Sequence, residues 1–163
     1  MKQVFGLFAV IFILAIGTFI AQKYLQTRDF SNLIGTDTSS KTPTATINNH
    51  TFNLEIAKTE AEKEVGLSAK ERLDENSGML FPFESPSYYP FWMKNMKFPI
   101  DIIFARNGLI VTIHKNVKPP ASPTEKPPIY NSTEPADTVL EINAGLSEKY
   151  KFKVGDVVRL ENT

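Results

Sequence analysis

The chain has 163 residues, 42% of them hydrophobic and 22% charged, which is typical of one globular domain with a short appendage and excludes wholesale disorder. Its 18 basic side chains balance its 18 acidic ones, and no stripe of Lys and Arg follows the chain, so the sequence offers no basic surface for nucleic acid. The absence of cysteine excludes disulfides, thiolate metal sites and a cysteine nucleophile.

The first long segment, residues 4–21, reads VFGLFAVIFILAIGTFIA and contains no charge. As a helix it would span about 27 Å, just enough to cross a hydrocarbon core about 30 Å thick. Because Lys2 precedes it, we predict a single transmembrane helix that anchors the C-terminal domain outside the cytoplasm at the cell membrane. The alternative is a cleaved signal peptide, with the small residues Ala15 and Gly17 before the cut and a secreted product.

The composition changes after this apolar segment. Residues 22–43 are rich in Ser, Thr and Asp and contain few large apolar side chains. Such a segment cannot bury enough apolar surface to fold by itself, so we interpret it as a flexible linker. Residues 1–3 form only a short flank before the apolar segment. The folded, β-rich domain is therefore predicted to span residues 44–163.

Most of the predicted domain consists of short β-strands. Residues 44–57 hold two β-prone runs around Asn48 and Asn49, which suit a tight hairpin turn. A second hairpin is predicted where Asn107 and Gly108 separate IDIIFA from LIVTIHK, because Asn-Gly favours a type I′ turn. Further strands are predicted for GMLFPF (78–83), DTVLEI (137–142) and GDVVRL (155–160).

Short helical segments are predicted between the strands. Thr59 and Glu62 have the spacing of a capping box, and Gly66 is suited to end the helix that they begin. Residues 147–152 can form one or two further turns, whereas the prolines of residues 118–135 lack amide donors and predict a surface excursion. The pattern predicts a mainly β fold, a compact antiparallel sandwich or irregular barrel with one or two short helices.

Five segments carry a resemblance to a known family, namely GLSAKERL, GMLFPF, FWMKNMKFPIDIIFARNGLIVTI, VLEINAG and KVGDVVRL. In this order and spacing, over roughly residues 46–161, the chain resembles the domain-of-unknown-function 192 family. The resemblance implies a compact, mainly β domain that is often exported or membrane-tethered in bacteria and archaea. It brings no established activity.

The strongest candidate site surrounds the only tryptophan of the chain. Trp92 precedes Lys94 and Asn95 in a segment that is predicted to turn toward Pro99, and Asp101 follows within an apolar run. Polar groups on the loops of a rigid β scaffold are typical of binding sites. The alternatives are a core tryptophan, a solvated lysine and a turn asparagine. A buried Asp101 needs a partner; the candidates are Lys94, Lys97 and Arg106, and we favour Lys94.

Glu141 poses a similar question in the segment DTVLEI. Period-two alternation places it with Val139, on the face opposite Leu140 and Ile142. It is either a solvent-facing residue or a second acid that lines the same cleft. We predict one partly open cleft formed by the candidate binding residues, namely Trp92, Lys94, Asn95, Asp101 and Glu141. Its apolar wall is predicted to comprise Phe81, Phe83 and Phe91.

No metal and no cofactor are predicted. The two histidines, His50 and His114, are isolated, and the sequence has no nucleophile elbow, phosphate loop or dinucleotide turn. Three classes of function remain open. The first is a membrane-tethered module that binds a small polar molecule, a cell-wall glycan or a peptide, and we favour it over catalysis. The second is a structural domain that contacts another envelope protein. The third is a hydrolase-like enzyme that uses Asp101 or Glu141 as an acid or base.

Overall fold

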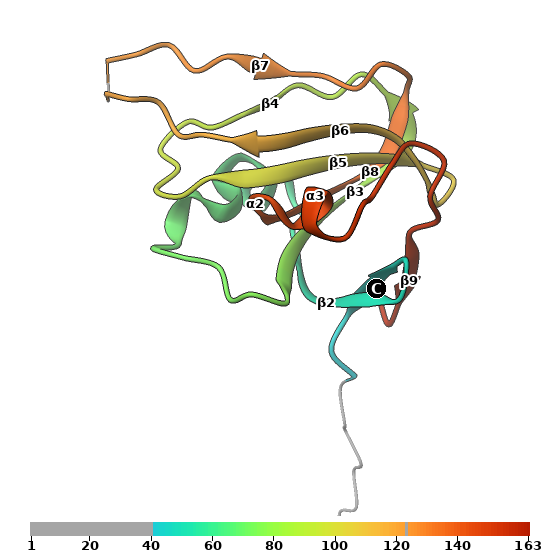
Figure 1. The fold of residues 1–163 in the computed structure, drawn as a ribbon. Coiled ribbons are helices and arrows are strands. Elements are labelled where there is room, and N and C mark those ends of the chain that lie inside the picture. The colour runs from blue at the N-terminus through green and yellow to red at the C-terminus, as the bar shows by residue number, and fades with distance from the viewer. Residues whose placement is uncertain (1–40, 123) are drawn as a thin grey trace, which may run out of the picture. The chain divides into compact units, whose positions relative to one another are not determined.

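The computed structural model describes residues 41–122 and 124–163. Its main element is a curled seven-stranded sheet in the order β6-β5-β8-β3-β2-β1-β9 (Figure 1). The strands of this sheet are β1 (Thr44–Ile47), β2 (His50–Ile56), β3 (Ser77–Ser87), β5 (Ile100–Arg106), β6 (Leu109–Val117), β8 (Ala136–Asn143) and β9 (Arg159–Glu161). A separate ribbon pairs β4 (Phe91–Trp92) with β7 (Ile129–Tyr130). The predicted surface excursion of residues 118–135 therefore contains a short strand.

Two of the strand connections are the hairpins that the sequence predicts. Asn48 and Asn49 join β1 to β2 with φ angles of 47° and 68°. Asn107 and Gly108 join β5 to β6 with φ angles of 51° and 73°. Positive φ at both central residues is the requirement of a type I′ turn, and Asn and Gly are the residues that meet it most easily. Both hairpin predictions are confirmed.

The helical elements are short. They are α2 (Glu60–Val65), a 3₁₀ turn labelled η1 (Gly66–Ala69), and α3 (Leu146–Lys149). The capping box is present, because the Glu62 amide donates to Thr59 Oγ1 at 3.2 Å and the Thr59 amide donates to the Glu62 carboxylate at 2.8 Å. Gly66 ends α2 with a φ of 49°. The predicted start and end of this helix are confirmed.

The fold is mainly β, as predicted, but it is not a sandwich of two facing sheets. Hydrogen bonds join the beginning of β6 to the segment before β9, where the Ile110 amide donates to the Asp156 carbonyl at 3.0 Å and the Val158 amide to the Gly108 carbonyl at 2.8 Å. The sheet therefore curls enough to bring the beginning of β6 against the segment before β9, and its shape is a half-barrel. The expected antiparallel pattern is wrong in one place, since β2 and β3 pair in parallel and α2 lies in the connection between them.

The side chains of β5 and β8 enter two apolar clusters on opposite faces of the sheet. The first cluster includes Phe52, Ile103, Leu140, Ile142 and Phe152. The second includes Phe81, Met93, Ile102, Phe104 and Val139. The β4–β7 ribbon packs beside the β5–β6 hairpin, because the ring of Phe91 contacts that of Phe104 and the ring of Tyr130 contacts that of His114. This second face holds the cleft described below.

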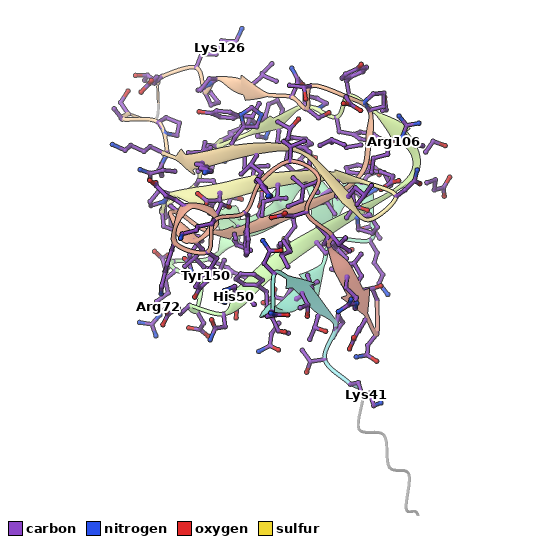
Figure 2. The ribbon with its side chains drawn as sticks, turned by 45° about the vertical axis from the view of Figure 1, so that its right-hand side comes forward. Lys41, His50, Arg72, Arg106, Lys126 and Tyr150 are labelled. Atoms are coloured by element: carbon purple, nitrogen blue, oxygen red, sulfur yellow. The ribbon has the colours of Figure 1, made fainter. Side chains whose placement is uncertain are left out.

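The two histidines serve packing in this fold. His50 at the start of β2 stacks on Tyr150 after α3, with ring centroids 3.7 Å apart (Figure 2). His114 on β6 is hydrogen-bonded through Nε2 to the carbonyl of Asn131 at 2.8 Å. Both rings therefore join elements that are distant in sequence.

The predicted membrane segment, residues 4–21, lies outside the described residues, as does nearly all of the predicted linker. Within residues 41–122 and 124–163, no helix has the length and apolar character needed to cross a membrane. The anchor and its signal-peptide alternative therefore stay predictions.

Candidate functional site

A cleft of about 540 Å³ opens on the second face of the sheet. The α2–η1 segment forms one side, β3 and the approach to β4 form the other, and β8 contributes a single residue, Glu141. The aromatic side chains that line it are Phe81, Phe83, Tyr89, Phe91 and Trp92. Its charged side chains are Glu60, Lys63, Glu64, Lys94 and Glu141. A cleft of this size that combines an aromatic wall with convergent polar groups is typical of small-molecule sites.

Glu141 is the buried acid of the cleft. It pairs across the sheet with Met79 on β3 and Ile102 on β5, and only 5% of its surface is exposed. Burial raises the pKa of its carboxyl group to about 8, since no described residue donates a hydrogen bond or charge to it. At neutral pH the group is therefore mostly protonated. Of the two alternatives from the sequence, the structure bears out an acid that lines the cleft.

A glycine sets the position of Glu141 against the neighbouring strand. A Cβ atom on Gly78 would lie 2.9 Å from the Glu141 carbonyl oxygen and 3.2 Å from side-chain atoms of Leu54 and Ile142. Any side chain at this position would push β3 away from β8. Gly78 thus permits the close pairing that holds Glu141 between two apolar strands.

The aromatic wall is built around Phe91. Its ring is perpendicular to that of Phe81, with centroids 5.1 Å apart, and to that of Phe83, with centroids 6.4 Å apart. Phe83 in turn stacks in parallel on Tyr89 at 3.6 Å. Edge-to-face pairs of this kind fix ring orientations as well as burying area. The predicted wall of Phe81, Phe83 and Phe91 is confirmed.

Trp92 stands at the rim of the cleft. It is 46% exposed, whereas the next residue, Met93, is fully buried. Alternation along β4 and the residue that follows it explains this arrangement, because successive side chains point to opposite faces. The interpretation of Trp92 as a core residue is wrong. Lys94 Nζ lies 5.7 Å from the centroid of the indole, within the range of a cation–π contact.

A second lysine contacts the aromatic wall from α2. Lys63 Nζ lies 4.6 Å from the centroid of the Phe83 ring and 2.9 Å from a carboxylate oxygen of Glu60. Its charge is therefore matched by Glu60. Glu64, also on α2, has no ion pair among the described residues.

Asn95 lies beside the cleft and does not line it. Its φ of 60° and its exposure fit the turn role that the sequence suggests. It borders an adjoining hollow of about 190 Å³ that shares Glu64, Trp92 and Lys94 with the main cleft. Trp92 thus lines both hollows, whereas Asn95 lines the smaller one and not the main cleft.

Asp101 is on the opposite face of the sheet. It is fully buried, and its carboxylate accepts backbone N–H bonds from Asn116 at 2.7 Å, Gly145 at 3.0 Å and Ser147 at 2.7 Å. These bonds join the end of β6 and the start of α3 to β5. The expectation that Asp101 reaches the cleft and pairs with Lys94 is wrong, because backbone amides take the place of the lysine.

Four charged or aromatic lining residues were not among the sequence-based candidates. Glu60, Lys63 and Glu64 enter the site with α2, and Tyr89 enters just before β4. The capping box predicts where α2 begins, but it does not predict where the helix packs against the sheet. That position depends on the parallel connection from β2 to β3, which has no local sequence signature.

Fold and cleft together define a small half-barrel β domain with one buried acid under an aromatic rim. The profile of the DUF192 family, described as "Uncharacterized ACR", matches residues 43–160, and the chain belongs to this family. This confirms the resemblance seen in the sequence. Among curated proteins, no match was found.

Two solved structures resemble the chain. One is a protein of unknown function from Novosphingobium aromaticivorans DSM 12444, with 32% identity and a TM-score of 0.65, over 71% of this chain and 83% of that one. The other, from Sinorhizobium meliloti 1021, is described as a "putative transcription regulator". It has 30% identity and a TM-score of 0.65, over 74% of this chain and 93% of that one.

Proposed function

We propose that the chain is a binding module whose cleft takes a small organic molecule. One observation carries the proposal: Glu141 is buried at the cleft with no partner among residues 41–122 and 124–163, and an exposed tryptophan stands at the rim. A buried polar group without a partner is costly, and a ligand that satisfies Glu141 would remove that cost. Exposure of a large indole is likewise offset when a ligand covers it.

The lining suggests how such a ligand is held. The rings of Phe81, Phe83 and Phe91 bury its apolar part, and Glu141 fixes the orientation of a polar group. Trp92 offers a flat surface to a ring, and a cell-wall sugar is one ligand with such a ring. We further propose that residues 4–21 place this module at the outer side of the cell membrane, or, if cleaved, leave it secreted.

A ligand screen tests the binding function. The purified full-length chain is heated with a panel of glycan fragments and small metabolites, and we expect at least one compound to raise the melting temperature. That stabilisation should be lost in Trp92→Ala and in Glu141→Gln and kept in Glu148→Gln, an exposed control outside the cleft. Stabilisation that survives both cleft substitutions, or a panel without any hit, would count against the proposal.

An interaction surface is the second candidate, and exposed apolar side chains favour it. Trp92 and Ile129 lie directly opposite each other in the β4–β7 ribbon and are 46% and 55% exposed. Val65 on α2 is 50% exposed. An envelope protein could cover such a patch. Replacement of Ile129, which does not line the cleft, by serine would weaken protein binding and leave small-molecule binding intact.

Hydrolase-like catalysis has less support. Asp101 is bonded to three amides on the other face of the sheet, so it is not available to a ligand in the cleft. Catalysis would then rest on Glu141, the only buried acid that lines the cleft among the described residues.

A further inference from the structure

We propose that the ligand of this cleft is an organic ammonium compound, whose positive charge lies against Glu141 among the aromatic rings. The inference rests on the proposed binding function and names the charge and chemical class of the ligand. Three features of the lining support it: its excess of acidic groups, its aromatic rings, and its hydroxyl groups, which already donate hydrogen bonds within the protein.

The lining of the cleft has more acidic groups than basic ones, which favours a cation as ligand. Three acids and two lysines line the cleft. Lys63 is matched by Glu60 at 2.9 Å, and Lys94 lies at the exposed rim over the indole of Trp92. Within the described part of the chain, Glu64 and Glu141 have no cationic partner. Once Glu141 ionises, the five charged groups sum to one negative charge.

Aromatic rings that can attract positive charge line the cleft. The ring of Phe91 is perpendicular to those of Phe81 and Phe83, so the ring planes of this wall differ in orientation. Ring faces carry partial negative charge and attract ammonium groups within about 6 Å. The chain already uses this attraction twice, since Lys63 lies over Phe83 and Lys94 over Trp92.

The hydroxyl donors of the lining are already engaged. Ser68 Oγ donates to the Val65 carbonyl at 2.6 Å, and the Tyr89 hydroxyl donates to the Ser85 carbonyl at 2.7 Å. The remaining donors of the lining are its two lysines and the indole N–H of Trp92; Lys63 is paired with Glu60, and Lys94 lies at the exposed rim. A ligand that needs a hydroxyl donor from the protein would have to break the two hydroxyl bonds. A ligand that brings its own donors and charge would not. The two unpaired carboxyl groups are then its acceptors.

Binding of a cation is coupled to the proton on Glu141. Burial raises the pKa of Glu141 to about 8 without ligand, so at pH 7 an ammonium group must displace its proton. Affinity then rises about tenfold from pH 6 to pH 7 and levels off above pH 8, with about one proton released at pH 7. A neutral acceptor would show the opposite trend. The other titratable groups that face the cleft are Glu60, Lys63, Glu64, Tyr89 and Lys94.

Calorimetric titration of the full-length chain tests the inference. The probes are choline, n-butylammonium and 3,3-dimethylbutan-1-ol. The last of these has the shape of choline but no charge. Titrations at pH 6, 7 and 8.5, each in two buffers of different ionisation enthalpy, measure affinity and proton release together. We expect choline or n-butylammonium to bind about tenfold more tightly than the alcohol at pH 8.5. Glu141→Gln should remove that preference and the pH dependence, and Glu148→Gln should keep both.

The outcomes separate this inference from the proposed function. Equal affinity for choline and the alcohol, affinity that falls as the pH rises, or unchanged ammonium binding in Glu141→Gln would overturn the ammonium assignment. So would the failure of both ammonium probes to bind at any pH. In each of these cases the screen with glycan fragments and metabolites still decides whether the cleft binds a neutral or anionic ligand.

Discussion

Two acids that look alike in the sequence have different roles in the structure. Asp101 and Glu141 each interrupt an apolar run, and the structure buries both. The carboxylate of Asp101 accepts hydrogen bonds from three backbone amides, whereas Glu141 faces the cleft and has no partner in the part of the chain that the structure describes. Alternation along β8 predicted the face of Glu141 correctly. The donors to Asp101 come from the end of β6 and from the start of α3, so no local pattern could reveal them.

Glu141 should make the stability of the folded state fall as the pH rises. Its pKa is about 8 when folded and about 4.5 when unfolded, so between these values the folded state holds more protons. This group should therefore lower the free energy of unfolding by about 2–4 kcal/mol from pH 5 to pH 9. Thermal melts at both pH values should show that Glu141→Gln removes this decline. An equal decline in the variant would mean that Glu141 is ionised at pH 7.

Asp101 should be a stabilising residue with no part in ligand binding. Asp101→Ala leaves three amides without an acceptor, and we expect a loss of about 3 kcal/mol or more, measured by urea unfolding. Glu134→Ala, an exposed control, should change stability by less than about 0.5 kcal/mol. A folded Asp101→Ala protein with unchanged stability would contradict this role.

At the level of elements, the features that depend on neighbouring residues were predictable. The two hairpins and the capping box each follow from a few adjacent side chains. The β4–β7 ribbon was missed because its strands have two residues each and lie far apart in the sequence. The parallel pairing of β2 with β3 was missed for the related reason that it depends on a long connection.

The α2 cap should influence the cleft as well as the helix. Thr59→Ala removes the hydroxyl that accepts the Glu62 amide, which should cost about 1 kcal/mol. Because α2 carries Glu60, Lys63 and Glu64, faster amide exchange in this helix should accompany weaker ligand binding. The matched control is Thr46→Ala, a half-buried strand position distant from α2 in the sheet order. Unchanged exchange in α2 would show that the cap is dispensable.

For the whole molecule, composition and strand patterns predicted a mainly β domain but not its sheet order. The curl depends on contacts between the beginning of β6 and the segment before β9, whose residues are more than forty positions apart. The cleft depends on that curl and on the β2–β3 connection. The sequence could therefore name the aromatic wall, Trp92 and Glu141 without placing α2 across from them.

The membrane prediction concerns the part of the chain before residue 41. If residues 4–21 anchor the protein, intact-mass measurement of the membrane fraction should give the full 18.3 kDa chain. Protease added to intact cells should then degrade the C-terminal domain. A soluble product that begins near Thr18 would instead establish cleavage of a signal peptide.

The central claim, that the cleft binds a small molecule, is tested most directly by the fluorescence of Trp92. This residue is the only tryptophan and stands at the rim, so all tryptophan emission comes from the edge of the cleft. Titration of the full-length chain with each compound that raises the melting temperature should shift the emission saturably. The same titration of Glu141→Gln should give at least about tenfold weaker affinity. Compounds that stabilise the protein while leaving Trp92 emission and the affinity of Glu141→Gln unchanged would contradict the claim.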